Sequence, residues 1–173
     1  MHLTEIIDEI ITTIRTQVKD FNDALFGTYL QQIRALGEEA IPLLRPYLND
    51  ERATVRDFVR DALTALQDTS MIPELLTFMT SPEESDRLGA ALCVVEYDKA
   101  QLLSAEQRET YVLLLRAMLN LSSNFQDRLR AVICLGTVVD DDTRRLIFLA
   151  HLPFESHASV RNNMLHRMRP DTS

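Results

Sequence analysis

Apolar residues near the start of the chain recur at steps of three and four, which keeps them on one face of a helix. The positions are Ile7, Ile10, Ile14, Val18, Phe21 and Leu25. This pattern predicts one long amphipathic helix over residues 3–26, closed by Gly27, and then a short helix ended by Gly37. We expect the two to form a capping hairpin over residues 1–37.

After residue 37 the sequence repeats itself. The Ile-Pro pair at residues 41–42 returns at residues 72–73, and residues 86–93 return as residues 127–134 with five of eight positions identical. The offsets are 31 and 41 residues. Fixed periods of this size indicate a repeat array, because each unit needs a stacked neighbour to bury its apolar face.

Each unit predicts a first helix, a polar turn and a second helix rich in Val, Leu and Ala. The second helices are expected near residues 54–66, 85–97, 126–138 and 157–168. Those at 85–97 and 126–138 are apolar on almost every side, so they belong in the middle of a stack. Residues 98–105 break the period and predict a longer connection between units.

One stretch resembles a known repeat family. Residues 40–50, Ala-Ile-Pro-Leu-Leu-Arg-Pro-Tyr-Leu-Asn-Asp, followed by Val55-Arg56 and Ala62-Leu63, resemble a HEAT repeat. The likeness is to the short HEAT-like repeats seen in phycobilisome lyase subunits and in many bacterial scaffold proteins. It implies an all-α fold, a right-handed α-solenoid of about four to five HEAT-like helical hairpins.

The domain organisation that follows from this resemblance is a single HEAT-like domain over residues 1–173. It has two clear repeats over residues 38–97. Two weaker repeats and a C-terminal cap follow over residues 106–170.

In HEAT repeats, an Asp in the turn and an Arg at the start of the second helix usually form a structural ladder. The matching positions are Asp50, Arg56, Arg87, Arg128 and Arg161. Ser81 stands where the second unit would have its Asp, so Asp86 or Asp127 could serve as partners instead. A basic row that grips an acidic ligand is the alternative, but the acids beside these arginines favour the ladder.

The charge is uneven along the chain. The net charge is −8, and residues 1–100 carry nine basic and eighteen acidic side chains, against nine and eight in residues 101–173. An acidic first half disfavours a nucleic-acid partner, because phosphate contacts need clustered cations. The arginines that favour such a partner lie near the C-terminus: Arg144, Arg145, Arg161, Arg167 and Arg169.

The residues that catalyse reactions or bind metals do not form a recognisable set. Cys93 and Cys134 sit in apolar runs at equivalent repeat positions, which predicts buried free thiols and a reducing, cytoplasmic compartment. The four histidines lack zinc-ligand spacing, no His-Glu dipeptide of the di-iron HEAT hydroxylases occurs, and no glycine-rich phosphate loop is present. We therefore expect no catalytic residue, no metal and no cofactor. Gly136, inside a second helix, is expected to permit close packing.

Exposed positions of the second helices are the candidates for binding, because these helices line the concave face in HEAT arrays. They are Arg60, Asp61, Thr64, Tyr97, Arg130, Asn162, Asn163 and His166. The main prediction is a non-enzymatic protein–protein interaction or scaffold module that binds another protein there. We expect a monomer or homodimer that does not enter the membrane.

Two alternatives remain open. The first is a bilin lyase-like subunit acting on phycobiliproteins, and it rests on the repeat subtype. The second is a nucleic-acid-binding HEAT protein similar to the DNA alkylation-repair glycosylases.

Overall fold

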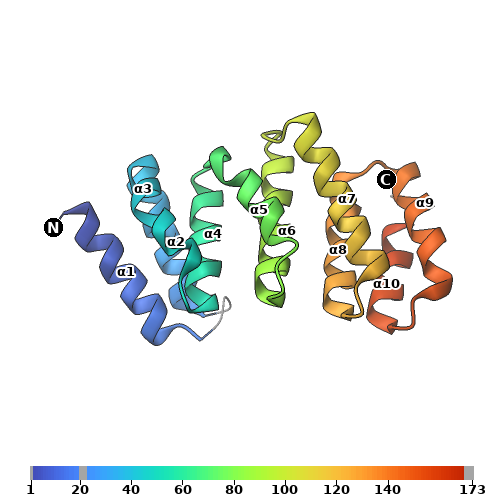
Figure 1. The fold of residues 1–173 in the computed structure, drawn as a ribbon, viewed down its shortest axis with the longest axis horizontal. Helices are drawn as coiled ribbons and strands as arrows, with labels where there is room; N and C mark the ends of the chain where they lie inside the picture. The colour runs from blue at the N-terminus through green and yellow to red at the C-terminus, as the bar shows by residue number, and fades with distance from the viewer. Residues whose placement is uncertain (1, 20–22, 170–173) are drawn as a thin grey trace. The chain divides into compact units, whose positions relative to one another are not determined.

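The computed structural model describes residues 2–19 and 23–169, and its regular secondary structure in these ranges is helical throughout (Figure 1). The chain divides between Ile72 and Pro73 into two compact units. Each unit is a set of packed helices with its own apolar core, as predicted for helical hairpins.

The first unit is built around its last α-helix. Its elements are α1 (Leu3–Gln17), α2 (Ala24–Leu36), η1 (Gly37–Ala40), α3 (Ile41–Leu44), η2 (Arg45–Asn49), α4 (Ala53–Ala65) and η3 (Thr69–Met71). Helix α4 packs against α1, α2 and α3. Phe58 of α4 meets Phe26 of α2 edge to face, with ring centroids 5.3 Å apart, and both are buried.

The predicted helix over residues 3–26 is wrong, because two helices occupy that range. Helix α1 ends at Gln17, and Val18 has extended backbone angles. Asp23 then begins α2 by accepting a hydrogen bond from the main-chain N–H of Leu25, which is an N-cap. Phe21 lies outside the described residues.

The two glycines of this region have different roles. Gly27 lies inside α2, where the sequence predicted a helix end. Gly37 has φ of 73° and does end α2, as predicted. The segment after it is broken into η1, α3 and η2 because Pro42 and Pro46 carry no N–H to continue a helical ladder.

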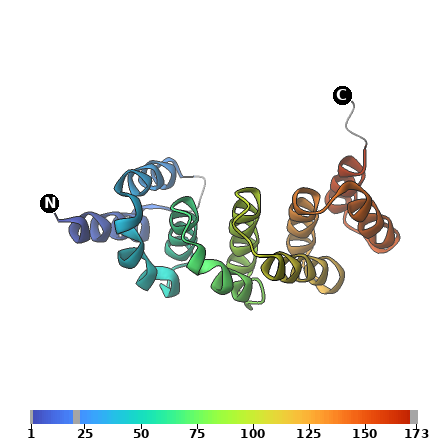
Figure 2. The ribbon, with the colours of Figure 1, turned by 90° about the horizontal axis from the view of Figure 1, so that it is seen from above.

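The second unit centres on α8. Its elements are α5 (Ile72–Phe78), which begins at the boundary, α6 (Glu84–Lys99), α7 (Ala105–Leu121), α8 (Phe125–Val138), α9 (Asp141–His151), η4 (Leu152–Phe154) and α10 (Ala158–Arg167). Helix α8 packs against α6, α7, α9 and α10, and Figures 1 and 2 show α6 and α8 side by side with α7 against them. This central place explains why residues 126–138 are apolar on nearly every side.

Residues 100–104, within the segment that breaks the period, connect two helices. Helix α6 ends at Lys99, and Gln101 has a positive φ of 59°. Ser104 then caps α7 through a capping box with Gln107. The positive φ at Gln101 and the capping box at Ser104 allow one helix to end and the next to begin within five residues.

Candidate functional site

The repeated arginines have one contact in common. Nη1 of Arg56, of Arg87 and of Arg128 each donates to the two main-chain carbonyls that lie six and five residues earlier, in the turn before its helix. The N···O distances lie between 2.8 and 3.2 Å. Each arginine therefore closes the turn that joins the two helices of its own repeat.

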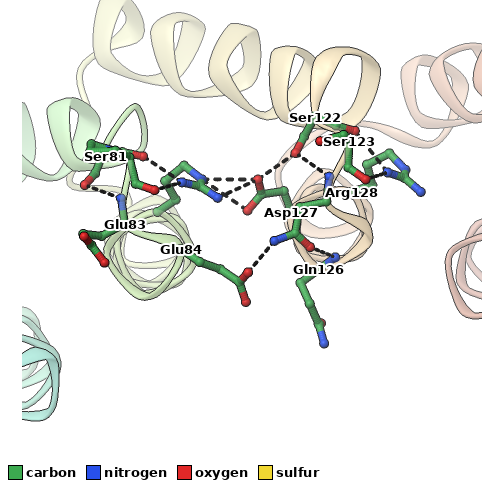
Figure 3. Close-up of polar contacts among 11 residues, drawn as sticks. Ser81, Glu83, Glu84, Ser122, Ser123, Gln126, Asp127 and Arg128 are labelled. Atoms are coloured by element: carbon green, nitrogen blue, oxygen red, sulfur yellow. Dashed lines mark hydrogen bonds and ion pairs between the residues drawn. The ribbon is translucent and has the colours of Figure 1, made fainter.

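Arg87 and Arg128 also bind an acid from the following repeat. Arg87 donates from Nε and Nη2 to the carboxylate of Asp127, with the shortest contact at 3.0 Å. Figure 3 shows Asp127 and the dashed contacts that its carboxylate receives. Arg128 does the same to Glu155, at 2.8 and 3.0 Å. Ser122 anchors Asp127 from the side at 2.7 Å. The pattern couples neighbouring repeats in the second unit.

Glu155 is held by several donors at once. Its carboxylate accepts from Arg128 and from the main-chain N–H of His157, and it contacts His151 Nε2 at 3.3 Å. Burial raises the pKa of Glu155, but these bonds, Arg128 first, outweigh it and bring the pKa from 4.5 down to about 2. Glu155 is therefore an ionised acid inside the fold, and its partners are structural.

The remaining ladder positions differ from this pattern. Asp50 accepts hydrogen bonds from Arg15 of α1 and from the main-chain N–H of Arg52. Arg161 is exposed, and it forms no side-chain hydrogen bond or ion pair within residues 2–19 and 23–169. Glu155, the acid that Arg128 binds, was not predicted from the sequence. None of the repeat alignments placed it at the position of an Asp.

The predicted partner-binding residues fall on both units. Arg60, Asp61 and Thr64 belong to α4 of the first unit. The other five lie on α6, α8 and α10 of the second. Each group is therefore described within its own unit.

Two of these residues are not on the surface. Arg60 has 0% of its area exposed and Tyr97 has 1%, so the prediction that they are available to a partner is wrong. Arg60 is retained in the core by its ion pair with Asp57, one turn earlier on α4. Tyr97 is buried because its ring lies on the core side of α6, with Val94 and Ala90.

The others keep some contact with solvent. Asn162 and His166 are exposed on α10, while Asp61, Thr64, Arg130 and Asn163 are half-buried. Their role in binding stays a prediction.

The two cysteines are buried free thiols, as predicted. Cys134 Sγ lies 3.8 Å from the main-chain carbonyl of Ala91, and the hydroxyl of Tyr111 donates to that carbonyl at 2.6 Å. Burial raises the pKa of Cys134, so the thiol is neutral at pH 7. This arrangement is one of core packing.

The described residues were also expected to lack a metal site and a membrane span. Within residues 2–19 and 23–169, His, Cys, Asp and Glu side chains form no group of three suited to a metal ion. In that same part of the chain, every helix is too short or too polar to cross a bilayer. Leu146 and Leu149, 71% and 58% exposed, form an apolar face on α9.

The comparisons with known proteins identify a fold. No family model matches the sequence, and no curated protein matches it. Among solved structures, the chain is similar to a chain of the complex of CpcE and CpcF of phycocyanin lyase from Nostoc sp. PCC7120. The two are 17% identical with a TM-score of 0.73, and the match covers 95% of this chain and 99% of that chain. The likeness confirms the all-α helical-repeat fold class, of the HEAT-like kind.

The main functional prediction is corrected by this finding. A non-enzymatic scaffold was predicted because the sequence shows no catalytic set. The neighbour belongs to a lyase complex, which favours the lyase-like alternative, so the predictions of a scaffold and of no enzymatic role are wrong. A helical-repeat fold can occur in a lyase complex without a recognisable local catalytic motif, so the lack of such a motif does not exclude that role.

Proposed function

We propose that this chain is a bilin lyase-like subunit, which handles a linear tetrapyrrole during its attachment to or removal from a phycobiliprotein. The observation that carries the proposal is the structural likeness to a chain of the phycocyanin lyase complex. That likeness extends over 95% of this chain and 99% of the other, so it concerns the whole fold rather than one common hairpin.

We also propose that the chain acts together with a second protein. The neighbour comes from a complex of two proteins. An apolar helix face exposed to water, such as Leu146 and Leu149 on α9, supports a protein contact, because such faces mark interaction sites in soluble proteins.

The first experiment is a titration of the purified chain with biliverdin, a linear tetrapyrrole, followed by visible absorbance and circular dichroism. A saturable change with an induced dichroism band is expected, because a chiral site twists the bound tetrapyrrole. The second experiment adds a protein partner, captured with the chain as bait from lysate of its host, and an acceptor phycobiliprotein. Covalent transfer is then read as zinc-dependent fluorescence of the acceptor band on a denaturing gel.

The outcomes separate clearly. Bilin binding together with transfer would support the lyase-like subunit. Absence of bilin binding by the chain, both alone and with its captured partner, would overturn the proposal. A Leu146→Ser, Leu149→Ser variant is expected to weaken the partner contact while it keeps the helical circular dichroism spectrum.

A further inference from the structure

Arg167 occupies a position on α10 where the helix faces the core. The inward face of α10 is formed by Val160, Asn163, Met164 and Arg167, at steps of three and four, and α10 packs on α8. Val160 and Met164 are fully buried. The arginine therefore continues an apolar stripe and lies half-buried against α8.

Gly136 of α8 makes room for this side chain. A Cβ atom at position 136 would lie 2.5 Å from Nη1 and 2.7 Å from Cδ of Arg167, closer than real Cβ atoms approach other heavy atoms. Any other residue at 136 would displace the guanidinium. The expected close approach at Gly136 thus occurs, and what approaches is one cation.

Arg144 of α9 fixes the backbone around this cation. Its Nε donates to the main-chain carbonyl of Arg167 at 2.9 Å, its Nη1 to the carbonyl of Gly136 at 3.4 Å, and its Nη2 to Asp141 at 2.6 Å. All three guanidinium nitrogens of Arg144 are thereby used. Arg144 positions α10 on α8, and its charge is neutralised by Asp141.

The guanidinium of Arg167 has no such partner. Within residues 2–19 and 23–169 it forms no hydrogen bond or ion pair, and its Nε is fully buried without an acceptor. Burial lowers the pKa of Arg167, and so does the neighbouring Arg144. The thiol of Cys134 lies near enough to influence that pKa, but it is protonated at neutral pH and supplies no counter-charge. A half-buried guanidinium with no anion among residues 2–19 and 23–169 gives up part of its hydration without gaining an ion pair from them, which points to a role other than packing.

We propose that Arg167 is the binding residue of a subsite for an organic carboxylate, shaped by Gly136 and held in place by Arg144. One uncompensated guanidinium matches one singly charged carboxylate, which it can bind through two parallel hydrogen bonds. Arg130 also influences the pKa of the Cys134 thiol, so the surroundings carry further positive charge. The inference rests on the proposed function in one respect: the carboxylate is then a propionate group of the tetrapyrrole.

The test uses the full chain with three variants. Arg167→Gln removes the charge. Gly136→Ala keeps every charge but displaces the guanidinium, and the higher helix propensity of alanine offsets part of the cost of that displacement. Arg161→Gln is the matched control, since Arg161 is exposed on the same helix and its replacement changes the net charge equally.

Two measurements are made on each protein. In the first, thermal unfolding is followed against sodium propionate, with sodium chloride at equal ionic strength as reference. Propionate is expected to raise the melting temperature of the wild type and of Arg161→Gln, and not of Arg167→Gln or Gly136→Ala. In the second, biliverdin and its dimethyl ester are titrated. The wild type should prefer the free acid by about tenfold, and Arg167→Gln should remove that preference, as expected for loss of a charged hydrogen bond.

The outcomes distinguish this subsite from the proposed function. Bilin binding with equal affinity for acid and ester would overturn the subsite and leave the lyase-like function intact. Propionate stabilisation that depends on Arg167, without bilin binding, would support the subsite and overturn the tetrapyrrole as its ligand. Failure of both would overturn both. A fourth variant, Asp171→Asn, tests for a carboxylate of the chain itself: stabilisation by propionate in that variant but not in the wild type would also overturn the proposal.

Discussion

Replacing Glu155 with glutamine removes a buried charge and leaves the shape of the side chain almost unchanged. The Glu155 side chain is 0% exposed and its partner Arg128 is 14% exposed, so water screens the pair little. The pKa of Glu155 falls from 4.5 to about 2 on folding. One pKa unit corresponds to about 1.36 kcal/mol, so ionised Glu155 contributes up to about 3 kcal/mol to the free energy of unfolding at pH 7.

The sign of the pH dependence follows from the direction of this change. Because the pKa is lower in the folded state, the contribution is fully present above about pH 4.5 and is lost as the pH falls toward 2. Glutamine cannot titrate. The stability difference between wild type and Glu155→Gln should therefore narrow from about 3 kcal/mol at pH 7 to about 2 kcal/mol at pH 3.5.

The assay is urea unfolding followed by far-ultraviolet circular dichroism, at both pH values. Glu109→Gln, an exposed acid on α7, serves as the control and should change stability by less than about 0.5 kcal/mol. A difference that is the same at pH 7 and pH 3.5 would refute the reasoning, because it would show that the loss does not come from the ionised carboxylate.

Three further predictions concern the core and the helix ends. Tyr111→Phe removes a buried hydroxyl that donates to a main-chain carbonyl of α6 at 2.6 Å, and should lower the free energy of unfolding by about 1 kcal/mol; an unchanged urea midpoint would contradict this bond. Gly37→Ala should destabilise the protein by about 1 kcal/mol, because φ at this position is 73°. Gly27→Ala, inside α2, should instead stabilise it by up to about 1 kcal/mol. Equal effects of the two variants in thermal unfolding would show that the ends of α2 are misplaced. Cys93 and Cys134 should react with a thiol reagent only after denaturant is added, and fast labelling of the native chain would show that the core opens.

The second helices could be predicted from the sequence because their apolar residues recur with helical spacing inside a repeat. Residues 126–138 were predicted and α8 spans Phe125–Val138; residues 85–97 were predicted and α6 spans Glu84–Lys99. The same signal failed at the N-terminus. Apolar spacing continues from Val18 to Leu25 although the helix stops, because the stop depends on the local cap at Asp23.

Burial of polar side chains was the harder inference. Periodicity treats every arginine as a surface residue, so Arg60 was assigned to an exposed face. The structure pairs it with Asp57 one turn away and leaves 0% of its area exposed. To predict such a buried pair, one must know which face of α4 the neighbouring helices cover. That depends on packing and not on the spacing of residues in the sequence.

Function was the least accessible property, because the repeat pattern describes how the chain buries its apolar residues and not what it binds. At 17% identity, the likeness to a lyase chain is a likeness of fold. Absence of a catalytic set therefore pointed to a scaffold, while the fold comparison favoured the opposite alternative.

In such a chain, a polar residue at a position where packing favours an apolar one is a better guide to function than the repeat pattern. Most polar residues at core-facing positions here have partners, as Glu155 has Arg128 and Asp127 has Arg87. Arg167 lacks one among the described residues, although a glycine opposite provides the space it needs. A sequence selected for stability alone would place an apolar side chain at this position on α10, next to Met164. We therefore expect Arg167 to serve binding rather than folding, and a ligand should be sought first at this residue.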